Sequence, residues 1–363
     1  MSNKFQVLEV CESYNGGVKR QVDYLNEYID NSKFELTTLV SSKRGGNISG
    51  SFIVDDNMSY FPNNIFKFIK SFKTIHNIVV DKNISLIHAH STIAGIVVIM
   101  YKILYFSKIP IVYTPHAYYS EISRGWVKDF LLITVEKFMS NFFSMNIHVS
   151  EEEENYAFDS GIVSKKESTV VNNGVPDSEY EVKMDNVKEL RFVNVARCDY
   201  QKNPELFIKI AKTICEIIPN VNFTWVGDGP LFDQCIKQVK NINLEDKIKF
   251  VGYSSNPFKY LNSSDIFLST SRYEGQPFSV IEALSVGLPL ILTDIVGHRE
   301  LVSNNGRLIT NKEILNKNNL CSLFEFVIEN KNDESIISRK LFEKKYNVKE
   351  MVKGIESVYK KVV

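Results

Sequence analysis

Short apolar, β-rich runs alternate with longer helical patterns along this chain, and this alternation constrains its fold more than any other feature. The runs are FQVLEV, ELTTLV, SLIHAH, IPIVYT, NIHVS and STVV in the first half, then RFVNVA, VNFTWVG, IKFVG, DIFLST and PLILTD. Strands separated by helices in this way form βαβ units, whose parallel strands are covered by helices on both faces. The sequence therefore predicts an α/β protein with doubly wound parallel sheets.

The length and one polar segment divide this pattern into two domains. A chain of 363 residues exceeds the size at which one hydrophobic core usually stops growing. Residues 172–190, NNGVPDSEYEVKMDNVKEL, contain a Gly-x-Pro and have no apolar period, as expected for a linker. We expect Rossmann-like domains at residues 1–173 and 174–345, and a final helix within 346–363 that packs back toward the first domain.

The composition excludes several classes of partner. Lys plus Arg and Asp plus Glu both number 43, so no global basic field favours nucleic acid. The five cysteines are scattered without a CxxC pair, which indicates reduced thiols in a cytoplasmic protein. The N-terminal segment lacks the apolar region of a signal peptide, and the apolar stretch 93–101 is too short to span a bilayer. We expect a cytoplasmic protein that meets a membrane only from its surface.

Polar residues of the first half follow strands, where open parallel sheets bind ligands. Gly16 and Gly17 follow the first strand, where the backbone can approach an anion closely, although such a pair is equally typical of a tight turn. His116 follows IPIVYT and can donate to a hydroxyl or a leaving phosphate; a loop histidine without a function is an equally good interpretation. His88 and His90 have no third metal ligand near them in sequence, so we predict no metal site.

The second half holds a candidate diphosphate site. Arg197 and Lys202 follow RFVNVA and precede a helix that Pro204 opens. Two cations beside a helix N-terminus suit a diphosphate, although two solvated surface charges remain an alternative. Glu274 lies in the loop before another helix start, and Glu282 lies about one turn inside that helix. Carboxylates can lie beside a phosphate if they accept hydrogen bonds from neutral hydroxyl groups of the same ligand. A nucleotide sugar has two hydroxyl-rich sugars joined by a diphosphate, so the sequence predicts a nucleotide-sugar site.

Taken together, these motifs resemble those of the retaining family-four glycosyltransferases of GT-B architecture, the glycogen-synthase-like enzymes with an E-x7-E motif. The resemblance is carried by ARCDYQKNPE, VGDGP and EGQPFSVIEA, and by NGGVKR, HAHS, TPHAYY and VNNGVP in the first half. It covers nearly the whole chain and implies two Rossmann-like domains facing a central cleft. The chain departs from the family at Ala196 and Cys198, where Gly and Leu are common.

The resemblance also implies roles for individual residues. Glu274 would bind hydroxyls of the transferred sugar, His116 would contact that sugar, and Arg197 with Lys202 would bind the diphosphate. The remaining contacts to the donor would come from Gly16, Gly17, Gly252, Tyr253, Phe278, Ser279 and Glu282, with Glu282 at the ribose. The donor would be a UDP- or GDP-sugar, and no metal ion or other cofactor is expected.

The implied reaction moves a hexose-type sugar from the donor to a hydroxyl of a glycan or an undecaprenyl-type lipid-linked glycan. Its setting would be the synthesis of a bacterial capsule, O-antigen or exopolysaccharide. Two alternatives stay open. A sugar-nucleotide epimerase or a phosphorylase can have the same architecture, and a non-catalytic module can bind a sugar nucleotide or a glycan.

Residues 61–80 form the most basic part of the first half. Lys67, Lys70 and Lys73 alternate there with apolar residues, and six lysines but one aspartate occur between residues 60 and 110. A helix of this kind can lie on the anionic inner leaflet of a membrane, which would suit a lipid-linked acceptor. The favoured alternative is an ordinary sheet-covering helix with solvated lysines.

Overall fold

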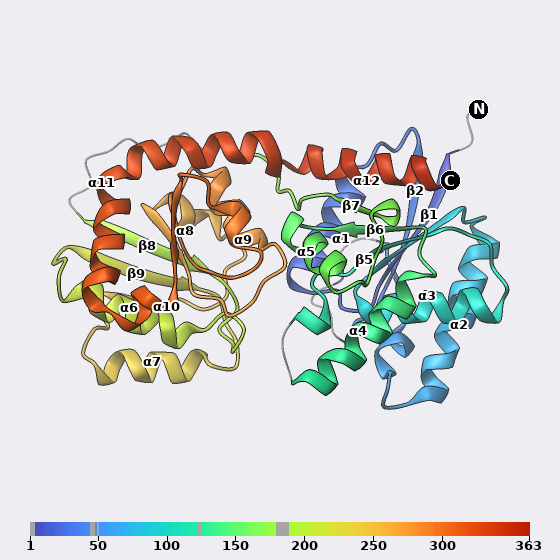
Figure 1. The fold of residues 1–363 in the computed structure, drawn as a ribbon, viewed down its shortest axis with the longest axis horizontal. Coiled ribbons are helices and arrows are strands. Elements are labelled where there is room, and N and C mark those ends of the chain that lie inside the picture. The colour runs from blue at the N-terminus through green and yellow to red at the C-terminus, as the bar shows by residue number, and fades with distance from the viewer. Residues whose placement is uncertain (1–3, 44–47, 49–50, 122–124, 179–188) are drawn as a thin grey trace. The chain divides into compact units, whose positions relative to one another are not determined.

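The computed structural model describes residues 4–43, 48, 51–121, 125–178 and 189–363. The chain forms two compact units (Figure 1). Unit 1 comprises Met1–Gly174 and Val348–Val363, and unit 2 comprises Val175–Asn347. The expected linker at 172–190 lies mostly outside the described residues.

Unit 1 is built on a seven-stranded sheet in which all neighbouring strands are parallel, in the order β3-β2-β1-β4-β5-β6-β7. The strands are β1 (Phe5–Cys11), β2 (Phe34–Val40), β3 (Ile53–Val54), β4 (Leu86–His90), β5 (Ile111–Thr114), β6 (Met145–His148) and β7 (Ser168–Val170). The two-residue β3 is too short to leave a pattern in the sequence and was not expected. The register places Glu9 of β1 beside His88 of β4.

Helices cover both faces of this sheet. The helices of unit 1 are α1 (Gly16–Tyr28), α2 (Ile65–Asp81), α3 (Thr92–Leu104), α4 (Trp126–Ser140), α5 (Glu151–Asp159) and α12 (Val348–Val362). Helices α2, α3 and α4 share one hydrophobic core with one face of the sheet. Helices α1 and α12 share a second core with the opposite face, so the last helix of the chain completes unit 1.

Unit 2 repeats this plan with a six-stranded parallel sheet in the order β10-β9-β8-β11-β12-β13. The strands are β8 (Leu190–Val195), β9 (Val221–Val226), β10 (Ile248–Phe250), β11 (Ile266–Ser269), β12 (Leu290–Thr293) and β13 (Gly306–Ile309). The helices are α6 (Pro204–Cys215), α7 (Phe232–Asn241), α8 (Phe258–Asn262), α9 (Phe278–Ser285), α10 (Asn311–Leu315) and α11 (Lys317–Leu341). Strand β13 was not expected from the sequence.

The strand order identifies where each sheet can hold a ligand. In unit 1 the order reverses between β1 and β4, and in unit 2 it reverses between β8 and β11. Loops after the two strands at such a point leave in opposite directions and open a crevice beyond their carboxyl ends. The prediction of two doubly wound Rossmann-like domains is confirmed. In the described part of the chain, no helix combines the length and hydropathy needed to cross a bilayer.

Candidate active site

The switch point of unit 2 brings together two predicted site residues that are 72 positions apart in the chain. The ammonium group of Lys202, in the loop after β8, donates a hydrogen bond to Oε1 of Glu274, in the loop after β11. Ser271 Oγ donates to the same oxygen at 2.7 Å, and Gln201 Nε2 lies 3.4 Å from the other. The carboxylate of Glu274 is therefore fixed by donors from both loops.

Further hydrogen bonds tie these two loops together. Thr270 Oγ1 donates to the carbonyl oxygen of Lys202 at 3.1 Å. The guanidinium of Arg272 donates to the carbonyl oxygen of Tyr200 at 3.0 Å and to Asn203 Oδ1 at 2.8 Å. Because both loops are braced in this way, Lys202 and Glu274 keep their relative position without help from a ligand.

The charge of Glu274 is maintained although its side chain is buried. Burial alone raises the pKa of this carboxyl, but attraction to Lys202 and His298, with the hydrogen bonds from Lys202 and Ser271, outweighs burial and lowers the pKa overall. Glu274 is therefore ionised near neutral pH and can only accept hydrogen bonds.

Sequence reasoning missed His298, a fully buried neighbour of this carboxylate. Its Nδ1–H donates to the carbonyl oxygen of Thr293 at 2.8 Å, and burial lowers the pKa of His298 to about 4. Gly297 precedes it with φ +81°, and a Cβ there would lie 2.0 Å from the carbonyl oxygen of Gly275. The VGHRE segment after β12 thus packs directly on the Glu274 loop. The sequence could have pointed to this residue, because Gly297 and His298 follow the predicted strand PLILTD.

The other predicted residues of unit 2 lie around the same end of the sheet. Arg197 is exposed after β8 and pairs with Asp199 at 3.1 Å. Gly252 and Tyr253 follow β10, where Gly252 has φ +76°. Phe278 and Ser279 are the first residues of α9, whose N-terminus carries a partial positive charge.

Two further details describe this helix. Pro277 is the N-cap of α9. Glu282 lies about one turn inside α9, where the sequence placed it, and its side chain is buried. In addition, a pocket of 790 Å³ in unit 2 lies between the starts of α6 and α10, and no predicted site residue lines it. The pocket adjoins the charged group at the switch point, because Asn203, Ser271 and Arg272 of the two loops line it.

The switch point of unit 1 holds the other predicted residues. Gly16 and Gly17 begin α1, and Gly16 has φ +53° with open space around its missing Cβ. The need for glycine here is therefore conformational. His116 follows β5 and also has a positive φ, +60°, which is uncommon for a residue with a side chain.

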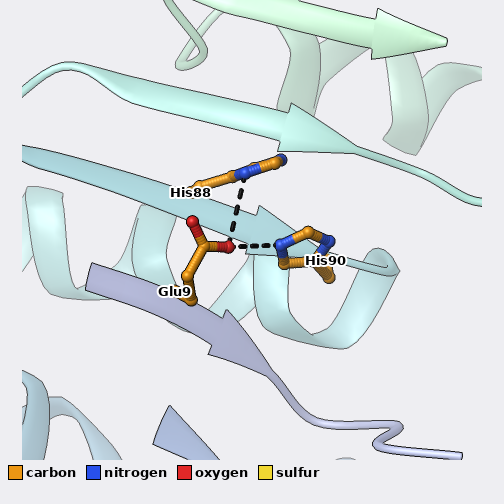
Figure 2. A group of neighbouring side chains, drawn as sticks. All are labelled: Glu9, His88 and His90. Carbon is orange, nitrogen blue, oxygen red and sulfur yellow. Dashed lines mark hydrogen bonds and ion pairs between the residues drawn. The ribbon is translucent and has the colours of Figure 1, made fainter. Parts of the chain in front are cut away.

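His116 is the outer member of a hydrogen-bonded chain of side chains. Figure 2 shows the inner part, Glu9 between His88 and His90. Oε2 of Glu9 lies 2.5 Å from His90 Nε2, and His90 Nδ1 lies 3.1 Å from His116 Nε2. On the other side, Tyr359 of α12 donates to Glu9 Oε1 at 2.5 Å. We call Glu9, His90 and His116 the histidine relay.

The direction of each hydrogen bond in the histidine relay follows from the protonation states of its members. The pKa of Glu9 is lowered, because attraction to His88 and hydrogen bonds from both histidines outweigh burial. Burial lowers the pKa of His90 to about 4 and that of His116 well below its usual value. An ionised Glu9 accepts from His90 Nε2–H, so His90 Nδ1 has a lone pair and accepts from His116 Nε2–H. We therefore assign His116 an unprotonated Nδ1, which accepts hydrogen bonds; the sequence interpretation had it donate.

Two members of the relay, together with His88, also contain the side-chain types that bind metal ions. Glu9, His88 and His90 each offer a ligand atom, all within 4.8 Å of one another. Tetrahedral zinc at about 2.0–2.2 Å from each ligand separates those ligands by roughly 3.3 Å. The 2.5 Å distance between Glu9 and His90 is a direct hydrogen bond instead, so the arrangement fits the relay better than a metal.

The basic segment 61–80 has a clear structural role. Helix α2 begins after the N-cap Asn64, and its residues Phe68, Phe72 and Ile75 are buried in the core of unit 1. Its lysines face solvent, so the helix covers the sheet in the way that the favoured alternative described.

Comparison with known proteins covers both units. A family model described as "Glycosyl transferases group 1" matches residues 179–348, and one described as "Glycosyltransferase Family 4" matches residues 15–179. The O-antigen biosynthesis glycosyltransferase WbnH of Escherichia coli is 28% identical over 312 residues, 84% of this chain and 85% of that protein.

Two further proteins are similar. The UDP-Gal:alpha-D-GlcNAc-diphosphoundecaprenol alpha-1,3-galactosyltransferase of Escherichia coli is 27% identical over 255 residues, 66% of this chain and 65% of that protein. The solved structure of Anabaena Alr3699/HepE with UDP and glucose superposes with a TM-score of 0.76 at 16% identity, covering 98% of this chain and 100% of that one. The family models, these relatives and the two parallel-sheet units agree: the chain belongs to the family-four glycosyltransferases of GT-B architecture.

Proposed function

We propose that this glycosyltransferase moves a hexose-type sugar, with retention of configuration, from a UDP- or GDP-sugar to a hydroxyl of a lipid-linked glycan. The observation that carries the proposal is the Lys202 and Glu274 pair at the switch point of unit 2. The retaining outcome rests on the resemblance of the E-x7-E motif. One relative is named for O-antigen biosynthesis and another for a UDP-galactose donor and a diphosphoundecaprenol acceptor, which supports a role in bacterial surface polysaccharide at the cytoplasmic face of the membrane.

Each charged group has a role in this proposal. Lys202, Arg197 and the N-terminus of α9 stabilise the negative charge that grows on the diphosphate as the bond to the sugar breaks. Glu274 accepts hydrogen bonds from sugar hydroxyls, and Glu282 accepts from the ribose. Because protein groups neutralise the diphosphate, donor binding requires no metal ion in this proposal.

A panel of UDP- and GDP-sugars, assayed for nucleotide release with and without a glycan acceptor, tests the proposal. A transferase releases nucleotide faster when acceptor is added and forms a glycoside. An epimerase converts the donor without acceptor, a phosphorylase requires phosphate, and a binding module binds donor without turnover. Only the first outcome supports transfer.

Arg197→Ala is expected to raise the KM for the donor by roughly 10- to 100-fold, because a charge-assisted hydrogen bond to the diphosphate is lost. The free energy of unfolding should change little, since the guanidinium is exposed. Lys212→Ala, which removes a charge from the exposed side of α6, is the matched control. Equal KM values for the two variants would show that Arg197 does not contribute to donor binding.

His90→Leu is expected to free His116 from its single tautomer and to weaken donor use about tenfold, the effect of one lost hydrogen bond. Nitrogen-15 spectra of histidine-labelled protein report the tautomer directly. His90→Asn, whose amide oxygen can accept from His116, should restore it in part. His148→Leu is the control, because His148 is equally buried at the end of β6 but bonds to Tyr118 and Ser168. An unchanged His116 spectrum in His90→Leu contradicts the assignment.

A further inference from the structure

Helix α4 of unit 1 presents large apolar side chains to solvent along its whole length. Trp126 is 84% exposed, Phe130 67% and Phe138 61%. Val127, Leu131 and Val135 are also exposed and lie on the same half of the helix, because they repeat at intervals of four residues. We call these six residues the α4 outer face.

The inner side of α4 shows that this exposure is not a feature of an ordinary amphipathic helix. Met139 packs into the core of unit 1. Glu136 is also buried, where its carboxylate accepts hydrogen bonds from the backbone N–H of Tyr119 at 2.8 Å and from Ser120. A surface helix normally turns its carboxylates to water and its aromatic residues to the core. Here a carboxylate points inward and three aromatic residues point outward.

The two other helices on this face of the sheet also carry exposed apolar residues. Helices α2, α3 and α4 cover the same face of the sheet and share one core. At the end of α3, Ile103 and Leu104 are exposed, and Phe106 follows with 89% of its side-chain area accessible. At the start of α2, Phe66 and Ile69 are exposed as well. The α4 outer face alone exposes six large apolar side chains on one half of a helix, and a large exposed apolar patch on a protein surface marks an interaction site.

Lysines dominate the exposed charges on α2 and α4, with Asp81 at the end of α2 as the exposed acidic residue among those of the two helices that the structure describes. Lys128 and Lys137 are exposed on α4, and Lys67, Lys70 and Lys73 are exposed on α2. Of the two acidic residues of α4, Glu136 is buried and Asp129 is half-buried. Apolar side chains surrounded by lysines complement a bilayer that carries anionic headgroups. A second copy of this chain would bring the same lysines to a symmetric interface, where like charges repel.

We propose that the α4 outer face is a docking surface that inserts into the headgroup region of an anionic lipid bilayer. This goes beyond the proposed function, because it names a surface and its partner and depends on no step of the transfer reaction. It also differs from the sequence interpretation, in which membrane contact was considered at residues 61–80 and an ordinary sheet-covering helix was favoured there. Four of the nine apolar residues of α2 are buried, including two of its three phenylalanines, whereas α4 keeps its largest apolar residues outside.

The two tryptophans of the chain allow a direct test. Trp126 lies on the α4 outer face, and Trp225 is fully buried in unit 2. Vesicles of phosphatidylcholine with phosphatidylglycerol are added to the protein, and co-sedimentation and tryptophan emission are recorded. We expect binding, a shift of emission to shorter wavelength, and quenching by brominated acyl chains. Trp126→Phe should abolish the shift and the quenching, because only Trp225 remains.

Variants separate the apolar and the charged contributions. The triple variant Phe130→Ser, Leu131→Ser and Phe138→Ser should lower vesicle partitioning by at least about a hundredfold. Lys128→Glu with Lys137→Glu should lower it by roughly fivefold for each lysine charge lost, and pure phosphatidylcholine should bind more weakly. Leu315→Ser, at an 83% exposed leucine of unit 2, is the matched control and should bind like wild type.

Three outcomes overturn the proposal: no vesicle binding by wild type, binding that the triple variant retains, or a Trp126 shift that follows protein concentration without lipid. The last outcome assigns the face to a second copy of the chain. Donor hydrolysis is measured in parallel on all variants. Normal hydrolysis by a variant that no longer binds vesicles leaves the transferase proposal intact, so failure of one proposal is distinguishable from failure of the other.

Discussion

Glu274→Gln is expected to slow sugar transfer by two to three orders of magnitude while the fold of unit 2 is retained. The substitution keeps the shape of the side chain but removes the charge that Lys202 and Ser271 fix at the switch point. A preorganised hydrogen-bonding group at a reacting sugar contributes an effect of this size because its orientation is set before the reaction begins. The loss should appear mainly in kcat.

Two controls separate a catalytic from a structural effect. Glu245→Gln removes an exposed carboxylate from the same unit and should leave transfer unchanged. Circular dichroism and thermal unfolding of Glu274→Gln establish that unit 2 is folded, since Lys202 remains partly accessible to water when its partner is neutral. A folded Glu274→Gln protein with wild-type kcat would exclude the proposed role of this residue.

Acidification from pH 7 to pH 5 is expected to destabilise unit 1 by at least about 2 kcal/mol and to leave unit 2 nearly unchanged. In unit 1, burial lowers the pKa of His90 and of His148 to about 4, and that of His116 further. Between pH 6.5 and 4 the unfolded chain therefore binds protons that the folded chain does not, and stability falls as the pH falls. Each of the first two histidines contributes roughly 2 kcal/mol by pH 5.

Two glutamates have the opposite effect, because they make the folded protein more stable as the pH falls. Burial raises the pKa of Glu121 in unit 1 and of Glu334 in unit 2 to about 7. The folded chain binds these protons first, so each glutamate adds roughly 2 kcal/mol of stability as the pH falls from 7 to 5. In unit 2 this gain offsets the loss from His298, whose pKa is about 4. In unit 1 the loss from three histidines exceeds the gain from the single glutamate, so the stability of unit 1 falls.

Urea unfolding at pH 7 and pH 5 measures the difference between the units. In the Trp126→Phe variant, fluorescence of Trp225 reports unit 2 alone, while circular dichroism reports both units. We expect the circular dichroism transition to begin at lower urea at pH 5 while the fluorescence midpoint stays in place. Glu121→Gln should enlarge the loss in unit 1. Equal shifts of both signals would contradict the assignment of acid sensitivity to unit 1.

Local sequence patterns predicted the long buried strands and the residues that follow them, because parallel strands are continuous apolar runs and ligand sites lie at their carboxyl ends. They did not predict β3, which has two residues, or β13, whose segment GRLI contains only two apolar residues. They also missed Glu9 and His298. Tyr359 lies 350 residues from Glu9, and the segment of His298 meets the Glu274 loop only in the folded unit. Only the folded register brings such groups within hydrogen-bonding distance.

The orientation of α4 was equally hidden. The segment WVKDFLLITVEKF is apolar on most sides, so its periodicity does not say which side meets the core. The backbone N–H of Tyr119 and the hydroxyl of Ser120 decide this, because they draw Glu136 inward. Likewise, the sequence located His116 after a strand, but the direction of its hydrogen bonds depends on His90 and Glu9.

The return of α12 to unit 1 sets the order in which the two units can be completed during synthesis. Residues 1–174 leave the ribosome first, yet their second core lacks Val352 and Ile355, and Glu9 lacks the hydroxyl of Tyr359, until the last residues are made. Unit 2 is continuous from Val175 to Asn347 and has all of its own residues earlier. The half of the enzyme that is translated first is therefore finished last, and a chain truncated after residue 347 has all the residues of unit 2 but an unfinished unit 1.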